Sequence, residues 1–295
     1  MSDSGVSAVS TARRVGIAPT DARRRARISW GVALPLAWVV LVAILALSAN
    51  WLGLPDPTDQ ALVMRRRPPS PEYLLGTDNL GRDMLSRIVY GARTSLTVGL
   101  CAPVLGFLVG GAIGMSAGYF RGKIDLLAVG FIDVLLAFPA LVLALTFTAY
   151  LGQSLFNVTL ALGILSIPAA ARVARANAMA WTNRDFVLAA RTIGASNWRI
   201  ITREILPNLL PAMFAFWLVA VSVIIVAEGA LSFLGLGIPA PLPSWGGMIA
   251  DGREALDVAP HVALIPAGVM FLTVLSLNYL GDLVRNMIDP RRSSL

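Results

Sequence analysis

The sequence predicts an all-α integral membrane protein with six transmembrane helices and both termini in the cytoplasm. Hydrophobic residues make up 56% of the 295-residue chain and charged residues only 14%, whereas a soluble domain usually carries about 25% charged residues. The mean hydropathy is +0.72. Several apolar runs approach the roughly 20 residues that a helix needs to cross a bilayer core. The outer surface of the chain is therefore expected to face lipid.

Six apolar segments account for the predicted membrane crossings. The first, near 29–50, has the length of a span rather than that of a cleavable signal, so we expect an uncleaved helix. The fourth is the weakest, because Pro168 and the arginines after it shorten the apolar run. The remaining five are expected near 94–119, 125–151, 155–172, 208–235 and 260–283.

Positive charge sets the orientation of these helices, because cytoplasmic loops carry the excess of Lys and Arg. The tail 1–28, the loops 120–124 and 172–207 and the C-terminal tail together hold 17 of these residues, and the other loops hold seven. The first set is expected to be cytoplasmic, which places 51–93 and 236–259 outside. The outer segment 51–93 is a mild conflict, because it carries six arginines.

The chain is expected to consist of a membrane core with polar tails. The core, 94–284, contains five of the six spans and a cytoplasmic loop at 182–206. Residues 1–28 are arginine-rich and have the polar composition of a disordered tail. Residues 285–295 form a second cytoplasmic tail.

Composition argues against an enzyme, a metalloprotein or a nucleic-acid-binding protein. Cys101 and His261 are the only residues of their types, so a clustered metal site or a histidine-paired nucleophile is not expected. The only lysine, Lys123, is followed by Ile124, so the chain lacks the P-loop sequence G-x-x-x-x-G-K-[ST]. The net charge of +7 comes from arginines in loops, which the positive-inside rule explains. We expect no cofactor, no metal and no nucleic-acid partner.

Four glycines spaced by four residues lie on one face of the second predicted span. This spacing lets a neighbouring backbone approach closely, and ordinary helix packing is favoured over a sliding or pore-lining seam. The four positions are Gly106, Gly110, Gly114 and Gly118.

Two acidic residues lie inside predicted spans, where a charge is costly. Asp133 lies near a predicted kink at Phe138-Pro139, and Glu228 lies in the outer half of the fifth span. Each either faces a polar translocation path or pairs with a neighbouring helix or subunit. We favour pairing for both.

The loop 182–206 interrupts the apolar sequence with charged and small residues. It is predicted to form two short helices, capped by Asn183 and Ser196 and separated by a break at Gly194. An apolar face beside arginines suits a helix docked in a groove of another protein, and equally an amphipathic helix on the membrane surface. The apolar faces are expected to be formed by Phe186, Ala190, Ile193, Trp198, Ile201 and Ile205.

The outer segments contain turn and helix signals. Thr77-Asp78-Asn79 is predicted to be a turn, followed by an amphipathic stretch at 81–90. That stretch is expected either to lie on the membrane surface, which we favour, or to receive an extracytoplasmic binding protein. The proline-rich loop 236–259, which includes Trp245, is expected to gate a path or to meet the same partner.

Three separate motifs carry a resemblance to a known family. Ala189-Ala190, three residues, Gly194 and then Leu206-Pro207 resemble the "EAA" loop of ABC importer permeases. "LLGTDNLGRDMLSRIVYGARTSL" at 74–96 and "EGALSFLGLGIPAPLPSWGGMI" at 228–249 resemble motifs of the dipeptide/oligopeptide/nickel branch, specifically its DppC/OppC-like subunit. The resemblance covers about 70–290. The sequence departs from the motif at Leu188, where Glu is usual, and at Glu204, which is often basic.

The resemblance implies a bundle of the ABC importer permease type, in which a cytoplasmic coupling helix docks on an ATPase. The implied partners are a second homologous permease, two cytoplasmic ATP-binding subunits and an extracytoplasmic substrate-binding protein, in a bacterial cell membrane. The outer partner is expected to contact Asp78, Arg82, Asp83 and Trp245. The residues expected to couple to the ATPase are Phe186, Ala189, Ala190, Arg191, Gly194, Ala195, Trp198 and Pro207.

The function predicted from this resemblance is that of a non-catalytic permease subunit that carries di- or oligopeptides or similar small solutes. An ion-gradient-driven transporter or channel, with Asp133 and Glu228 as a relay, is the alternative. A membrane enzyme is a third class, which the lack of clustered His, Cys or acidic residues disfavours. The sequence does not specify the substrate.

Overall fold

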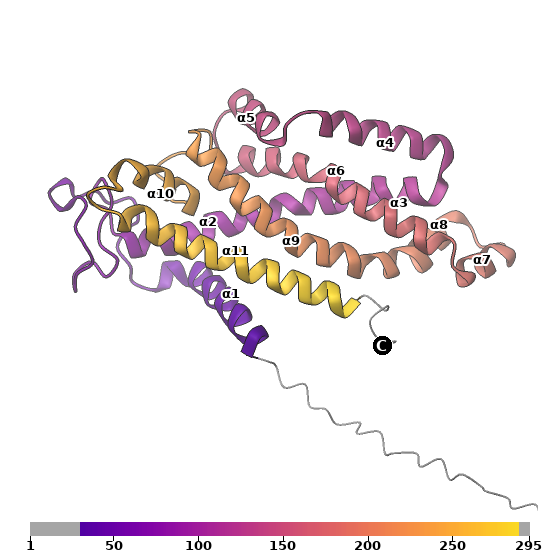
Figure 1. The fold of residues 1–295 in the computed structure, drawn as a ribbon, viewed down its shortest axis with the longest axis horizontal. Coiled ribbons are helices and arrows are strands. Elements are labelled where there is room, and N and C mark those ends of the chain that lie inside the picture. The colour runs from indigo at the N-terminus through magenta and orange to yellow at the C-terminus, as the bar shows by residue number, and fades with distance from the viewer. Residues whose placement is uncertain (1–29, 289–295) are drawn as a thin grey trace, which may run out of the picture.

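The computed structural model describes residues 30–288, and every regular element in that range is helical (Figure 1). The tail predicted at 1–28 and most of the tail predicted at 285–295 lie outside the described residues. The α-helices are α1 (Trp30–Ser48), α2 (Met84–Leu105), α3 (Gly111–Phe120), α4 (Gly122–Ala137), α5 (Ala140–Leu151), α6 (Leu155–Thr182), α7 (Asp185–Thr192), α8 (Asn197–Ile200), α9 (Leu206–Phe233), α10 (Trp245–Gly252) and α11 (His261–Ile288).

Five helices in the described range are long and apolar enough to cross a membrane, and a sixth crossing is interrupted. The five cover Gly31–Trp51, Met84–Phe120, Leu155–Thr182, Asn197–Phe233 and His261–Met287. The predicted span 125–151 is instead the pair α4 and α5, which meet at an angle of 82°. The break lies at the predicted kink, where Phe138 precedes a proline and has extended backbone angles.

Three predicted boundaries differ from the structure. The stretch 81–90 is largely the first part of α2 and is not a separate surface helix. The fourth span does not end at 172, because α6 continues through Pro168 to Thr182. A proline removes a single backbone hydrogen bond, and α6 is held on both sides of that position by its buried packing against other helices. The fifth span begins before 208, because the π-helical turn Ile201–Ile205 joins α8 to α9.

The glycine face predicted in the second span packs against α6. A Cβ atom built on Gly110 would lie 2.5 Å from the carbonyl oxygen of Ile167, and one built on Gly118 would lie 2.6 Å from that of Arg175. On α6, the small residues Ala170 and Ala174 are buried against this face. The packing interpretation is thus confirmed, because the backbones of the second span and α6 approach each other closely at these glycines.

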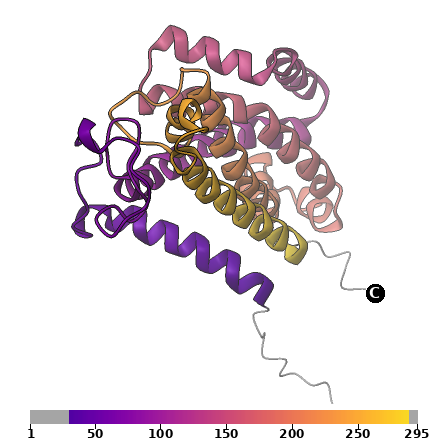
Figure 2. The same ribbon diagram turned by 60° about the vertical axis from the view of Figure 1, so that its left-hand side comes forward.

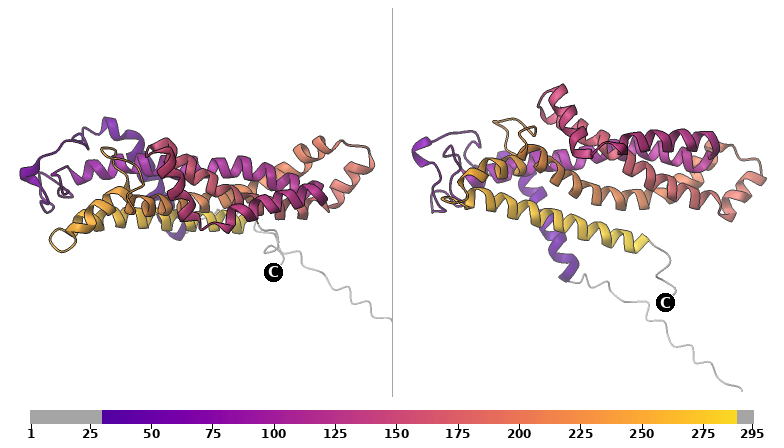
Figure 3. Two further views of the ribbon diagram at one scale, coloured as in Figure 1. Left: turned by 90° about the horizontal axis from the view of Figure 1, so that it is seen from above. Right: turned by 45° about the horizontal axis from the view of Figure 1, so that its top comes forward.

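The remaining helices surround this pair. Figure 2 shows α1 at one edge of the bundle beside α11, to which Trp38 Nε1 donates a hydrogen bond of 3.1 Å at Thr273. The opposite edge is formed by α4 and α5, and both views in Figure 3 show α7 protruding at one end of the molecule. The other end carries α10 and the segment 51–83 (Figure 1). The predicted loop sites therefore lie at opposite ends of the spans.

Candidate functional site

The loop 182–206 has the predicted two-helix form, with one cap misassigned. Gly194 ends α7 with a φ of +78°, a conformation that favours glycine. Ser196 caps α8, and its Oγ accepts a hydrogen bond of 3.4 Å from the Arg199 backbone N–H. Asn183 does not cap α7, because it still belongs to the end of α6 and its Oδ1 accepts a hydrogen bond of 3.2 Å from Arg121.

The residues of the predicted apolar faces divide between exposed and buried positions. Ile193 and Trp198 are 84% and 75% exposed, as a face that docks on a partner requires. Ile201 and Ile205, predicted on the same face as Trp198, are instead buried within the chain together with Ile200. The apolar residues of the loop that are buried against α3 and α6 are Val187, Ile200, Ile201 and Ile205.

Two contacts between α3 and the loop fix the position of its helices. The Tyr119 hydroxyl donates a hydrogen bond of 2.7 Å to Asn197 Oδ1, and the Arg191 guanidinium lies 5.1 Å from the centre of the Tyr119 ring. Of the predicted coupling residues, Ala190 and Ala195 are partly buried. The exposed ones are Phe186, Ala189, Arg191, Gly194, Trp198 and Pro207. The loop therefore presents apolar side chains on a well-anchored backbone.

The end of the molecule opposite the loop 182–206 contains a buried ionic cluster that joins the segment 51–83 to α2 and α10. Asp78 Oδ2 lies 2.6 Å from Arg82 Nε and 3.3 Å from Arg87 Nε, and all three side chains are buried. Both arginines also approach Asp251 Oδ2, at 3.6 Å and 3.8 Å. Partial burial raises the pKa of the Asp251 carboxyl above its ordinary value, although Arg87 and Arg82 oppose that rise. Sequence reasoning missed Arg87 and Asp251, because they come together only when α10 folds onto α2.

The other end of α10 is fixed by Glu228 and Trp245. Glu228 Oε1 accepts hydrogen bonds from Ser232 Oγ at 2.7 Å and from Ser244 Oγ at 2.9 Å. Trp245 is fully buried and donates from Nε1 to the Ile88 carbonyl at 3.1 Å. These are packing contacts within the chain, so Glu228 lies among helices rather than on an open path.

The four residues predicted to contact an outer partner are all buried in this structure. Asp83 caps α2 by accepting a hydrogen bond of 2.7 Å from the Ser86 backbone N–H, and the other three make the contacts described above. Their side chains make ion pairs and hydrogen bonds within the chain, so they would support a contact surface for an outer partner rather than form it. The four are Asp78, Arg82, Asp83 and Trp245.

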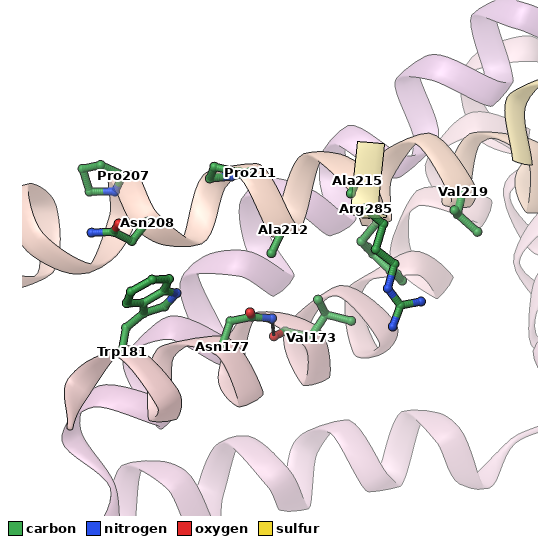
Figure 4. A pocket seen from close by; sticks show the side chains of 11 residues that line it. Val173, Asn177, Trp181, Pro207, Asn208, Pro211, Ala212, Ala215, Val219 and Arg285 are labelled. Atoms are coloured by element: carbon green, nitrogen blue, oxygen red, sulfur yellow. Dashed lines mark hydrogen bonds between the residues drawn. The ribbon is translucent and has the colours of Figure 1, made fainter. Parts of the chain in front are cut away.

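A groove between α6 and α9 holds two cavities. The first, which we call the end cavity, has a volume of about 630 Å³ and lies near the loop 182–206. Figure 4 shows Trp181 of α6 opposite Asn208 of α9 and Asn177 opposite Ala212, with Arg285 extending toward the same space. The second, the middle cavity, has a volume of about 400 Å³ and is lined by residues of α5, α6 and α9. The two cavities share lining residues on α9, Phe216 and Val219.

Asp133 pairs across α4 and α6 with Arg172, whose Nη2 lies 2.9 Å from Asp133 Oδ1. A second pair joins the same helices, with Arg175 Nε 2.5 Å and Nη2 2.7 Å from the two oxygens of Asp125. The predicted pairing of Asp133 with a neighbouring helix is therefore present. Within residues 30–288, no three His, Cys, Asp or Glu side chains are grouped to hold a metal ion.

Comparison with known proteins places this geometry in a family. Residues 110–294 match the family described as "Binding-protein-dependent transport system inner membrane component". A protein of Brucella suis biovar 1, provisionally named a peptide transport system permease, is 41% identical over 272 residues, covering 92% of this chain and 91% of the relative. The glutathione transport system permease protein GsiD of Pectobacterium atrosepticum is 40% identical over 226 residues, covering 77% and 75%.

Solved structures share the fold. The MetNI methionine ABC transporter in an inward-facing conformation matches with a TM-score of 0.57 and 16% identity, covering 70% of this chain and 98% of the matched chain. An amino acid ABC transporter crystallised with histidines matches with a TM-score of 0.53 and 19% identity, covering 69% and 94%. With the family match over most of the membrane helices, the gradient-driven alternative is set aside. The chain belongs to the family of binding-protein-dependent transport system inner membrane components, as an inner-membrane permease component of an ABC importer.

Proposed function

We propose that this chain pairs with a homologous permease to form the path of an importer for di- or oligopeptides or similar small solutes. The names of its relatives support this substrate class, because they refer to peptide and glutathione transport. In this arrangement the chain itself is non-catalytic, and ATP hydrolysis is supplied by two cytoplasmic ATP-binding subunits.

The loop 182–206 is proposed to be the element that couples ATP hydrolysis to transport. The single observation that carries this proposal is its exposed apolar surface at one end of the spans, centred on Ile193 and Trp198. Large apolar side chains exposed together on a helical surface are typical of a contact with another protein. The buried residues of the same loop attach it to α3 and α6, so a displacement of the loop is transmitted to those helices as a rigid-body movement.

The orientation follows from the same assignment. If the loop 182–206 meets cytoplasmic ATP-binding subunits, then α10 and the segment 51–83 face outward and both termini are cytoplasmic. The outer surface is then available to an extracytoplasmic substrate-binding protein. Exposed apolar residues of the segment, including Trp51 and Val63, are the contact candidates in place of the buried residues predicted from sequence.

Co-purification with the ATP-binding subunits tests the coupling role. Trp198→Glu places a charge on the exposed apolar surface without removing a buried contact, and is expected to lose the ATP-binding subunits from an intact permease pair. Val63→Glu is the matched control, because Val63 is equally exposed at the opposite end of the molecule. Retention of the ATP-binding subunits by Trp198→Glu, or their equal loss from both variants, contradicts the proposal.

A further inference from the structure

The ion pair between Asp133 and Arg172 is unusually exposed for its position. Arg172 lies within the membrane-spanning helix α6, and Asp133 lies within α4 of the bent pair. Their side chains are nevertheless 60% and 57% exposed, for Arg172 and Asp133 respectively. Charged side chains inside a membrane protein face a protein interior or a water-filled cavity rather than lipid, because exposure to hydrocarbon is costly. This pair is therefore expected to meet water, lipid headgroups or another protein surface rather than hydrocarbon.

The second ion pair on the same two helices shows what a packing contact looks like here. Arg175 and Asp125 make a two-pronged contact, and their side chains are only 31% and 20% exposed. Bidentate geometry is the strong form of an arginine–carboxylate contact, and this pair joins α4 to α6. The Asp133–Arg172 contact uses a single nitrogen and oxygen, so other polar atoms of both groups remain free to bind elsewhere.

The exposed pair borders the groove between α6 and α9. Arg172 lies two turns further along α6 than Leu165, so the two side chains project from nearly the same face. Leu165 lines the middle cavity, and the residue after Arg172, Val173, lines the end cavity. The pair thus lies next to residues of α6 that line the two cavities, on the edge of α6 that faces α4, although neither Asp133 nor Arg172 itself lines them.

We infer that Asp133 and Arg172 form a charged contact site on the solute path, for a solute that carries both an ammonium and a carboxylate group. The guanidinium offers donors that match a carboxylate, and the aspartate oxygens accept hydrogen bonds from an ammonium group. In the empty site the two side chains neutralise each other, which lowers the cost of keeping them in the membrane. This inference rests on the proposed import function and adds the charge pattern of the solute.

Thiol labelling tests whether the pair faces water. In a Cys101→Ser background, which removes the only cysteine, Asp133→Cys and Arg172→Cys are prepared in the assembled transporter. Each is treated with membrane-impermeant methanethiosulfonate reagents, one anionic and one cationic. Asp133→Cys keeps Arg172 beside it and should react faster with the anionic reagent, whereas Arg172→Cys should react faster with the cationic one. Leu127→Cys, on a different face of α4, is the control that should not react.

The labelling results separate the two environments of the pair. Reaction at both positions with opposite charge preferences supports the site. Lack of reaction at both positions shows that lipid or the partner permease covers the pair and overturns the inference. Reaction without a charge preference, or with equal rates at position 127, also overturns it.

Uptake of alanylalanine into proteoliposomes tests the solute class. Asp133→Asn and Arg172→Gln are each expected to lower uptake per assembled transporter by about tenfold, the effect of losing one hydrogen bond to a charged group. Arg175→Gln is the matched control, and its effect should appear in the yield of assembled transporter rather than in uptake by each assembly. Unchanged uptake in the first two variants overturns the inference. If the parent transporter retains its ATP-binding subunits but does not take up alanylalanine, only the inferred solute class is wrong. If the parent transporter does not retain those subunits, the proposed function itself is contradicted.

Discussion

Glu228 of α9 accepts a hydrogen bond of 2.9 Å from Ser244, the residue that caps α10. The Ser244 Oγ in turn accepts a hydrogen bond of 3.0 Å from the Gly247 backbone N–H. One buried side chain therefore fixes both the cap of α10 and its attachment to α9. This link would make α10 move with α9.

Loss of the Glu228 carboxylate is expected to release the first turn of α10. Glu228→Ala leaves the buried hydroxyls of Ser232 and Ser244 without this acceptor, which costs about 1–3 kcal/mol. Amide hydrogen exchange at 244–250 should become faster, with little change at 200–205. Glu228→Gln keeps an acceptor oxygen and serves as the control. Equal protection of α10 in the parent and Glu228→Ala would show that the carboxylate does not hold the helix.

The close approach of α6 to the π-helical turn Gly106–Gly110, which precedes α3, predicts a strong effect of a small substitution. Gly110→Ala would place its Cβ against the Ile167 carbonyl, and the required shift is expected to lower the free energy of unfolding by about 1–3 kcal/mol. Gly130→Ala on α4 is the control, because a Cβ atom at that position would have no neighbour within 4 Å. Thermal unfolding of the purified permease in detergent compares the two. Equal melting temperatures for both variants would contradict the tight packing of this pair.

The outer ionic cluster predicts unequal effects for its two acids. Asp78 is buried and contacts both arginines, so Asp78→Asn leaves buried positive charge uncompensated and should cost about 3–5 kcal/mol of unfolding free energy. Asp251 is 54% exposed and more distant from both arginines, so Asp251→Asn should have a much smaller effect. Denaturation midpoints of the two variants measure this difference. A larger loss in Asp251→Asn would refute the assignment of Asp78 as the centre of the cluster.

Gly194 is predicted to act through its backbone conformation alone. Nothing lies within 4 Å of a Cβ at this position, but its φ is +78°. Gly194→Val should therefore strain the turn by about 1–2 kcal/mol and displace α7 relative to α8. Gly194→Asn should be tolerated better, because Asn adopts this conformation more readily. Retention of the ATP-binding subunits on purification is the readout, and equal retention by both variants would show that the turn geometry does not matter.

The sequence was sufficient to predict the class of the fold, because apolar runs and arginine-rich loops reflect the membrane directly. The kink at Phe138-Pro139 and the cap at Ser196 were also predicted, since both depend on local backbone chemistry. The end of α6 was predicted too early, because the packing of α6 against other helices outweighs the effect of Pro168. The apolar face predicted on the second helix of the loop 182–206 was partly wrong, because Ile201 and Ile205 are buried against other helices of the chain whereas Trp198 is exposed.

The polar contacts that define the candidate sites required the structure. Glu228 and Ser244 lie on either side of a loop, and Arg172 meets Asp133 only after α4 folds back on α6. Charged residues of the outer segment were predicted to be exposed contacts, but Asp78 and Arg82 neutralise each other in the interior. Residue type alone does not distinguish a buried ion pair from an exposed one.

The central claim is that the loop 182–206 contacts the ATP-binding subunits. Its most direct test is cysteine cross-linking in the purified transporter with a short bifunctional thiol reagent, in a Cys101→Ser background. Ile193→Cys and Trp198→Cys are each expected to cross-link to an ATP-binding subunit that carries cysteines on its permease-facing surface, while Val63→Cys is not. Lack of cross-linking from both loop positions in an assembled, ATP-hydrolysing complex, or equal cross-linking from position 63, would contradict the claim.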